Sequence, residues 1–270
     1  MKTFGIVNIT EDSFSDGGRY LEPSAAIGHA RKLVDDGADV VDLGAASSNP
    51  DAQPVPPDLE VARLVPVVAA LKQDGAAISI DTFSQEVQRW ALAQAVDYLN
   101  DIRGFPDAEF YPELAASRTK LVVMHSVQER GPATRVPVPP DGIFDRCIRF
   151  FQSRLSALIN AGIDRRRLIL DPGMGFFLSS DPEASLTMLR RLPDLKRAFG
   201  LPILVSVSRK SFLRELTGTP PEEAGPASLA AELFSHLQGA DCIRTHEARS
   251  LRDVLTIWRA LSRETDGNVP

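Results

Sequence analysis

Polar side chains able to bind a small molecule recur near the ends of eight short apolar runs in this sequence. In chain order they are Asn8 and Thr10, Asp42, Asp81 and Thr82, Asn100 and Asp101, His125 and Ser126, Asp171, Ser208–Arg209–Lys210, and Arg244–Thr245–His246. A carboxylate at the mouth of an apolar barrel can accept two parallel N–H donors from an amino-pyrimidinone edge. Asp81, Asn100 and Asp171 together therefore indicate recognition of a flat heterocycle. Capping of the following helix is the alternative, and it stays open above all for Asp42 and Asp101.

The last two apolar runs are followed by a cluster of basic side chains. Arg209, Lys210 and Arg244 carry fixed positive charges, and His246 adds a group that titrates. Arginine offers a fork of donors and lysine a point charge, so the cluster is typical of a phosphate or oxyanion site. The alternative is that these cations pair with nearby Asp and Glu side chains.

A bound metal is only weakly indicated. The four histidines form no cluster in the sequence, whereas the amide oxygen of Asn8 together with phosphate oxygens would suit Mg²⁺. We expect Mg²⁺ as the cofactor and His125 as a packed residue rather than a catalytic base.

The elements that must position these residues alternate between strands and helices. The apolar runs are short and rich in Val, Ile and Leu, which is typical of parallel strands buried on both faces. They are Phe4–Ile9, Val40–Leu43, Ala77–Ile80, Tyr98–Leu99, Lys120–Met124, Leu168–Leu170, Ile203–Val207 and Cys242–Ile243. Eight such units in one chain of 270 residues, with no linker and no Rossmann fingerprint, predict an α/β fold. We expect a single-domain (β/α)₈ TIM barrel over residues 1–270, with all strand ends on one face.

Helices and loops fill the stretches between the predicted strands. We expect helices from Pro23–Ser24 to Asp36–Gly37, from Ser84 to about Val96, and, longest of all, from Asp141–Gly142 to near Ala161–Gly162. The long connections Glu11–Pro23, Ala45–Pro57 and Gln128–Asp141 are interpreted as lids or binding loops, with surface insertions as the alternative.

Composition narrows the class of protein. The chain is 43% hydrophobic and 24% charged, which excludes disorder and leaves enough apolar surface for a large core. Its apolar runs are too short for a membrane span, and it begins without a signal-peptide pattern, so a cytoplasmic location is expected. A net charge of −6 argues against nucleic-acid binding, and the cysteines Cys147 and Cys242 suggest neither a disulfide framework nor a metal site.

Several of these segments resemble dihydropteroate synthases, and the similarity runs along essentially the whole chain. The matching segments are Phe4–Gly18, Gly37–Gly44, Ser79–Thr82, Asn100–Gly104, Val123–His125, Asp171–Phe176, Ser208–Lys210 and Ile243–His246. The resemblance implies a transferase of folate biosynthesis. Such enzymes join 4-aminobenzoate to 6-hydroxymethyl-7,8-dihydropterin diphosphate, giving 7,8-dihydropteroate and diphosphate.

The resemblance also implies roles for individual residues. Asp81, Asn100 and Asp171 would hold the pterin edge, with Lys210 at the opposite side of the ring. Arg244 and His246 would hold the diphosphate, Ser48 would add a contact from the second loop, and Asn8 would contact Mg²⁺. Ser208, Arg209, Phe176 and Phe177 would lie at the 4-aminobenzoate end. Lys210, Arg244 and His246 would be the catalytic residues, acting on the leaving group and the pterin rather than as nucleophiles.

Two departures from the family pattern resemble those of the mobile sulfonamide-resistance enzymes. The second loop carries Ala45–Ala46–Ser47–Ser48–Asn49–Pro50, so that Ser48 replaces a threonine and Asn49 an arginine. After Asp171 the sequence continues through Phe176–Phe177–Leu178–Ser179, with an added aromatic ring and no lysine. The hypothesis is that Phe177 narrows the 4-aminobenzoate pocket and excludes sulfonamides.

Other functions stay open at this stage. A drug-sensitive housekeeping dihydropteroate synthase, a pterin-binding methyltransferase and a non-catalytic pterin-binding protein are the alternatives. The family also implies a homodimer through the last helices, with small-molecule substrates as the other partners and neither nucleic acid nor membrane.

Overall fold

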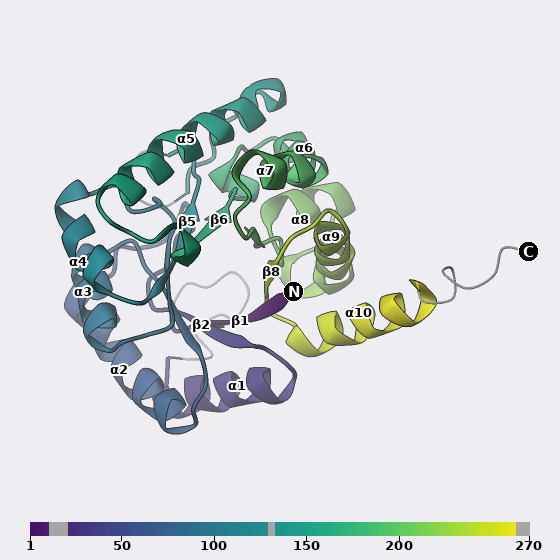
Figure 1. The fold of residues 1–270 in the computed structure, drawn as a ribbon. Helices are drawn as coiled ribbons and strands as arrows, with labels where there is room; N and C mark the ends of the chain where they lie inside the picture. The colour runs from purple at the N-terminus through teal and green to yellow at the C-terminus, as the bar shows by residue number, and fades with distance from the viewer. Residues whose placement is uncertain (11–20, 129–132, 263–270) are drawn as a thin grey trace, which may run out of the picture.

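The structure, a computed structural model, describes residues 1–10, 21–128 and 133–262 and confirms the predicted (β/α)₈ barrel (Figure 1). Eight parallel strands follow the sheet order β6-β5-β4-β3-β2-β1-β8-β7. They are β1 (Lys2–Asn8), β2 (Val40–Gly44), β3 (Ile78–Asp81), β4 (Tyr98–Asp101), β5 (Lys120–Met124), β6 (Leu168–Asp171), β7 (Leu204–Val205) and β8 (Cys242–Thr245). The two ends of this sheet meet at one bridge, between Leu170 and Ile203, which closes the ring.

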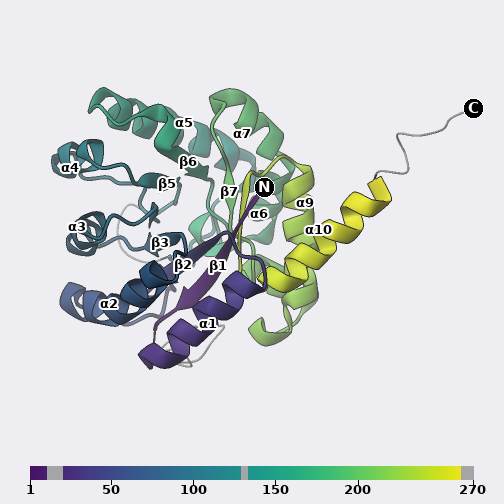
Figure 2. The same ribbon diagram turned by 60° about the horizontal axis from the view of Figure 1, so that its bottom comes forward.

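Helices surround the strands on the outside of the barrel (Figure 2). The α-helices are α1 (Pro23–Asp35), α2 (Pro57–Gln73), α3 (Gln85–Ala93), α4 (Tyr111–Ala116), α5 (Pro140–Asn160), α6 (Pro182–Arg190), α7 (Leu192–Phe199), α8 (Ser211–Thr217), α9 (Gly225–Leu237) and α10 (Ala248–Ser262). Short 3₁₀ turns are η1 (Ala108–Phe110), η2 (Arg165–Arg167), η3 (Gly175–Phe177) and η4 (Pro221–Glu223). The predicted longest helix is confirmed as α5.

The strands are apolar on both faces because each face packs against a different layer. A cluster of residues from seven strands fills the barrel interior: Phe4, Val40, Tyr98, Val122, Ile169, Leu204 and Cys242. A larger cluster joins the outer strand faces to the surrounding helices. The interior cluster lies near the amino-terminal ends of the strands, so polar side chains at the other ends meet above an apolar floor.

Two element boundaries differ from the sequence prediction. The helix that begins after Ser84 ends at Ala93 rather than Val96, because Ala95 has a φ of 51° and cannot continue a right-handed helix. Strand β7 has two residues instead of five. Of the three long connections, the one at 45–56 is described in full, whereas 11–20 of the first and 129–132 of the third lie outside the described residues.

The structure also bears on the expectations for the two cysteines and for membrane-spanning helices. Cys147 and Cys242 are both buried free thiols. In the part of the chain that the structure describes, no helix combines the length and the apolar character that a membrane span requires.

Candidate active site

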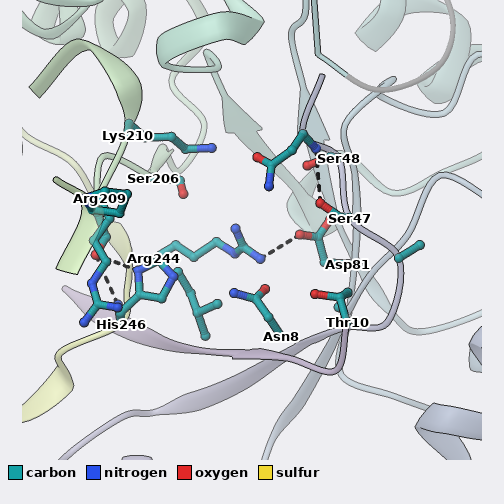
Figure 3. Close-up of a pocket in the computed structure, with 16 residues that line it drawn as sticks. Asn8, Thr10, Ser47, Ser48, Asp81, Ser206, Arg209, Lys210, Arg244 and His246 are labelled. Carbon is teal, nitrogen blue, oxygen red and sulfur yellow. Dashed lines mark hydrogen bonds and ion pairs between the residues drawn. The ribbon is translucent and has the colours of Figure 1, made fainter. Parts of the chain in front are cut away.

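Two adjoining cavities open at the carboxyl ends of the strands, where the fold predicts a site, and Figure 3 shows the larger of the two. The larger has a volume of about 120 Å³, and the smaller about 20 Å³. They share Ser48, Asp81, Ser206, Lys210 and Arg244, so they form one continuous site. Asn8, Ser208, Arg209 and His246 belong to the larger chamber, and Asn100, Asp171 and Phe177 to the smaller.

Arg244 crosses the floor of the site to Asp81 (Figure 3) and also binds Asp42. Its Nε lies 2.5 Å from Asp42 Oδ2 and its Nη2 2.6 Å from Asp81 Oδ2. Burial opposes its charge, but Asp42 and Asp81 more than offset this and raise the pKa of Arg244 above its ordinary value. Burial also raises the pKa of Asp81 to about 6, against the effect of Arg244. Arg244 is thus the cation that pairs with both buried carboxyl groups of the floor.

Asp42 corrects one sequence interpretation. It was placed at the end of the second strand, as a possible helix cap, but it lies in the middle of β2 and is 1% exposed. Its side chain points into the barrel because alternate residues of a strand face the same side. One of its oxygens has no hydrogen bond among the described residues.

Asp171 and Asn100 form the deep wall of the smaller chamber. Asp171 Oδ1 accepts a hydrogen bond of 2.8 Å from the Gly173 N–H, and burial raises the pKa of this carboxyl to about 6. Asn100 is 3% exposed, and its Oδ1 has no hydrogen-bond partner among the described residues. Unpaired buried polar atoms are costly, so these groups are suited to a ligand that supplies N–H donors.

Lys210 and Phe177 face each other across the same chamber. The Lys210 Nζ lies 4.9 Å from the centre of the Phe177 ring, a cation–π contact. Burial, with help from Arg244, lowers the pKa of Lys210 to about 8. Phe177 is 5% exposed and packs with Ile102 and Met124. The free volume of about 20 Å³ holds roughly one water, so a bicyclic ring requires side chains here to move.

At the basic end of the site, hydrogen bonds with two serines hold Arg209 and His246 in place. Arg209 adopts a φ of 57°, and its N–H donates to Ser228 Oγ at 2.9 Å. Its guanidinium reaches Glu247 at 3.4 Å. Ser208 Oγ lies 2.9 Å from His246 Nδ1 and accepts the His246 backbone N–H at 3.2 Å. Burial first, and then the neighbouring cations, lower the pKa of His246 well below its ordinary value, which keeps the imidazole neutral.

Loops after three different strands meet above the smaller chamber. The Ser48 carbonyl accepts a hydrogen bond of 2.9 Å from Ala133 N–H, which joins the loop after β2 to the loop after β5. Arg135 binds Asp51 at 2.8 Å and stacks over the Phe176 ring at 5.5 Å. Phe176 therefore lies under Arg135 and lines neither chamber, unlike the other predicted site residues.

A magnesium ion would find few protein ligands here. The described residues contain no group of three or more His, Cys, Asp or Glu side chains arranged to hold a metal. Asn8 and Thr10 line the larger chamber, and the buried Thr10 Oγ1 has no hydrogen-bond partner among the residues that the structure describes. This donor set fits Mg²⁺ that keeps waters and phosphate oxygens as its other ligands.

His125 is a packed residue, as expected, and Asp101 has the structural role that was left open for it, whereas Ser206 is a site residue that was not predicted. His125 is buried with Nδ1 3.0 Å from the Pro172 carbonyl, and Asp101 accepts the N–H groups of Arg103 and Phe105 in the turn after β4. Ser206 lines both chambers with a buried hydroxyl that has no hydrogen-bond partner among the described residues. The sequence feature that could have identified Ser206 is its position as the one polar residue inside the apolar run Ile203–Val207.

Comparison with known proteins gives one consistent result. The profile of the pterin binding enzyme family matches residues 4–246. The type-2 dihydropteroate synthase of Escherichia coli is 60% identical over 258 residues, covering 96% of this chain and 95% of that protein. The Xanthomonas albilineans enzyme with 4-aminobenzoic acid is 35% identical, with a TM-score of 0.87 over 100% of this chain and 94% of that one. The Yersinia pestis enzyme in a sulfonamide drug complex is 31% identical, with a TM-score of 0.89 over 97% and 94%.

Proposed function

From the premise that this chain belongs to the pterin-binding enzyme family and is a dihydropteroate synthase of folate synthesis, we propose that it is a sulfonamide-insensitive form that confers sulfonamide resistance. The observation that carries this proposal is the Phe177 ring, buried in the smaller chamber and stacked on Lys210. It fills space that a drug larger than 4-aminobenzoate would need. The 60% identity to a type-2 enzyme supports assignment to the mobile resistance subfamily.

In this proposal the pterin is recognised by the deep wall of the smaller chamber. Asp81, Asn100 and Asp171 accept N–H donors from the edge of the heterocycle, which supplies the partner that Asn100 Oδ1 lacks. Lys210 reaches the ring from the opposite side of the chamber. Arg244 leaves Asp81 and lies over the pterin when the ring enters, because the chamber has too little room for both.

The larger chamber is suited to the diphosphate group. Arg244 and His246 donate to it, Ser48 adds a contact from the loop after β2, and Asn8 would hold Mg²⁺. When bound, Mg²⁺ would neutralise charge on the diphosphate and so favour its departure. The protein side chains then stabilise the leaving group and the positive pterin-methyl carbon, and no side chain forms a covalent bond.

The amine substrate enters beside Ser208 and Arg209. Its amino group adds to the pterin-methyl carbon and loses a proton, and its carboxylate pairs with a cation at the rim, for which Arg209 is placed. Phe177 acts on this approach from the adjoining smaller chamber through Lys210, which lines both chambers and lies over the Phe177 ring. Phe176 acts indirectly by keeping Arg135 stacked over the turn that carries Phe177.

The deciding experiment measures diphosphate release with sulfamethoxazole present. We expect the natural protein to turn over in drug that inhibits a sensitive synthase, and Phe177→Gly to regain inhibition by about 10- to 100-fold, equal to 1.4–2.8 kcal/mol. Phe83→Gly is the matched control, because Phe83 packs on the same cluster from the β3 side without lining either chamber. Equal inhibition of both variants and of the natural protein refutes the role of Phe177, and full inhibition of the natural protein leaves a drug-sensitive housekeeping synthase.

A homodimer through the last helices also remains a proposal. Phe234 and Leu237 of α9 and Ile257, Trp258 and Leu261 of α10 are exposed, between 37% and 63%. Exposed apolar side chains gathered on neighbouring helices are typical of a protein interface. Sedimentation of the natural protein at micromolar concentration tests this, and a monomer would refute it.

A further inference from the structure

Glu232 is a buried acid that the proposed reaction does not use. It lies on α9 behind the basic end of the site, with 0% of its surface exposed. Neither carboxyl oxygen has a hydrogen bond of ordinary length and angle among the described residues. The hydroxyls of Thr245 and Ser208 nevertheless lie close enough to favour its ionised form. A buried acid beside an anion site needs a physical reason, because its charge would repel the ligand.

The face of α9 that carries Glu232 contacts the segments that form this end of the site. Gly225, Ser228 and Glu232 are spaced by three and four residues, so they share one helix face. Ser228 Oγ accepts the Arg209 N–H at 2.9 Å and donates to the Ala224 carbonyl at 2.7 Å. A Cβ at Gly225 would lie 3.0 Å from a Glu247 carboxylate oxygen. This face is therefore packed tightly against the loop after β7 and the turn after β8.

The environment keeps the Glu232 carboxyl neutral near pH 7. Burial raises its pKa to about 8, Glu247 adds to that increase, and the hydroxyls of Thr245 and Ser208 offset part of it. A neutral carboxyl has an O–H donor as well as an acceptor oxygen, whereas a carboxylate can only accept.

Ser208 connects this carboxyl to His246. Its hydroxyl has one hydrogen, and its oxygen already accepts the His246 backbone N–H. If that hydrogen points to His246 Nδ1, 2.9 Å away, the imidazole proton must be on Nε2. If the hydrogen points to Glu232 instead, Nδ1 must carry the proton and Nε2 becomes an acceptor.

We propose that Glu232 is a positioning residue whose neutral carboxyl donates to Ser208 and thereby fixes His246 as the Nε2–H tautomer. The second ring nitrogen then donates into the chamber that receives the diphosphate. This inference rests on the proposed role of His246, but the tautomer itself is measurable without substrate. The charged group that acts on Glu232 is Glu247, which pairs with Arg209. The charged and titratable groups that act on His246 are Arg209, Arg244, Lys210 and His29.

The test is ¹⁵N NMR of the histidine rings in the full-length protein. The chain has four histidines, so His246→Gln identifies the His246 signals by their loss. We expect the Nε2–H tautomer at pH 7 and a change to Nδ1–H by pH 9.5, when the ionised Glu232 takes the Ser208 hydrogen. Glu232→Gln, which stays neutral, should keep Nε2–H throughout. Glu247, Arg209 and Lys210 are the same in both proteins, so the difference isolates Glu232.

Two results would overturn the inference. One is an Nδ1–H tautomer in the natural protein at pH 7, and the other is an identical pH response in the natural protein and Glu232→Gln. If Glu232→Gln does not fold, Ser208→Ala replaces it, because removal of the connecting hydroxyl should also abolish the pH response.

Kinetics separate this inference from the proposed function. We expect the KM for dihydropterin diphosphate to rise about tenfold more in the natural protein than in Glu232→Gln between pH 7 and 9.5, as expected for loss of one hydrogen bond to a charged group. A changed tautomer with an unchanged KM ratio would support the link from Glu232 to His246 and refute the contact between His246 and diphosphate.

Discussion

Replacing Arg244 by methionine should destabilise the protein strongly, and more at high pH than at low pH. The variant keeps most of the side-chain length but removes the cation that lies 2.5 Å from Asp42 and 2.6 Å from Asp81. Removal of one partner from a buried ion pair costs about 3–5 kcal/mol, because the remaining charge is left in the interior without compensation. We expect a loss of that size in the free energy of unfolding at pH 8.

The pH dependence follows from the pKa of Asp81. Burial raises this pKa to about 6 although Arg244 lowers it, so removal of Arg244 must raise it further. A carboxyl whose pKa is higher in the folded than in the unfolded state costs stability as the pH rises through its folded pKa. The loss caused by Arg244→Met should therefore be smaller at pH 5, by about 1.4 kcal/mol for each unit by which the pKa of Asp81 rises.

Urea denaturation at pH 5 and pH 8 measures both quantities by linear extrapolation. Arg190→Met is the matched control, because Arg190 pairs with Glu183 on the surface and its side chain is 58% exposed. That variant should lose less than about 1 kcal/mol at either pH. Equal losses for Arg244→Met at the two pH values, or a loss no larger than that of the control, would refute the assignment of Arg244 as the cation that stabilises the floor.

Three further outcomes are expected. Asp171→Asn keeps an acceptor for the Gly173 N–H and removes a carboxyl whose pKa is raised to about 6, so its melting temperature should rise more at pH 8 than at pH 5, while turnover is lost; a lower melting temperature at pH 8 would contradict this. Arg135→Ala breaks an exposed pair with Asp51 and should change the free energy of unfolding by less than about 1 kcal/mol. Steady-state kinetics should nevertheless show a raised KM for 4-aminobenzoate, and an unchanged KM would remove Arg135 from the site. Chelation of Mg²⁺ should raise the KM for dihydropterin diphosphate in the diphosphate-release assay. In the Asn8→Ala variant this KM should be insensitive to Mg²⁺, and full sensitivity to Mg²⁺ in that variant would exclude Asn8 as a ligand.

The fold was predictable because buried parallel strands have a distinctive composition. Short runs such as Lys120–Met124 are apolar on both faces, and the structure places a strand at each of the eight runs. Since all strand ends in a barrel share one face, the same pattern also brought Asp81, Asn100 and Asp171 together. The positions of these residues along the sequence were therefore enough to predict both the strands and the grouping of the three polar side chains.

Features that depend on register and side-chain direction were not predictable. Asp42 lies two residues before the end of β2, and only the alternation of side chains in the actual strand shows that it faces Arg244, 202 residues away. Phe176 and Phe177 are adjacent in sequence, but the η3 turn directs one under Arg135 and the other into the chamber. Glu232 looked like an ordinary helix residue, because the sequence does not show which helix face meets which loop.

The single bridge between β6 and β7 has a consequence for how such sites diversify. Neighbouring strands elsewhere in the barrel are joined by ladders of two to five residue pairs, whereas this seam has only Leu170 and Ile203. Phe177 lies in η3, in the connection that follows β6, so added bulk there disturbs no ladder of paired strands. Asp171 lies at the end of β6 and Lys210 in the loop after β7, so a ligand that contacts both would bridge the two strands across this seam. The seam between β6 and β7 thus combines tolerance of inserted residues with direct influence over which substrates the site accepts.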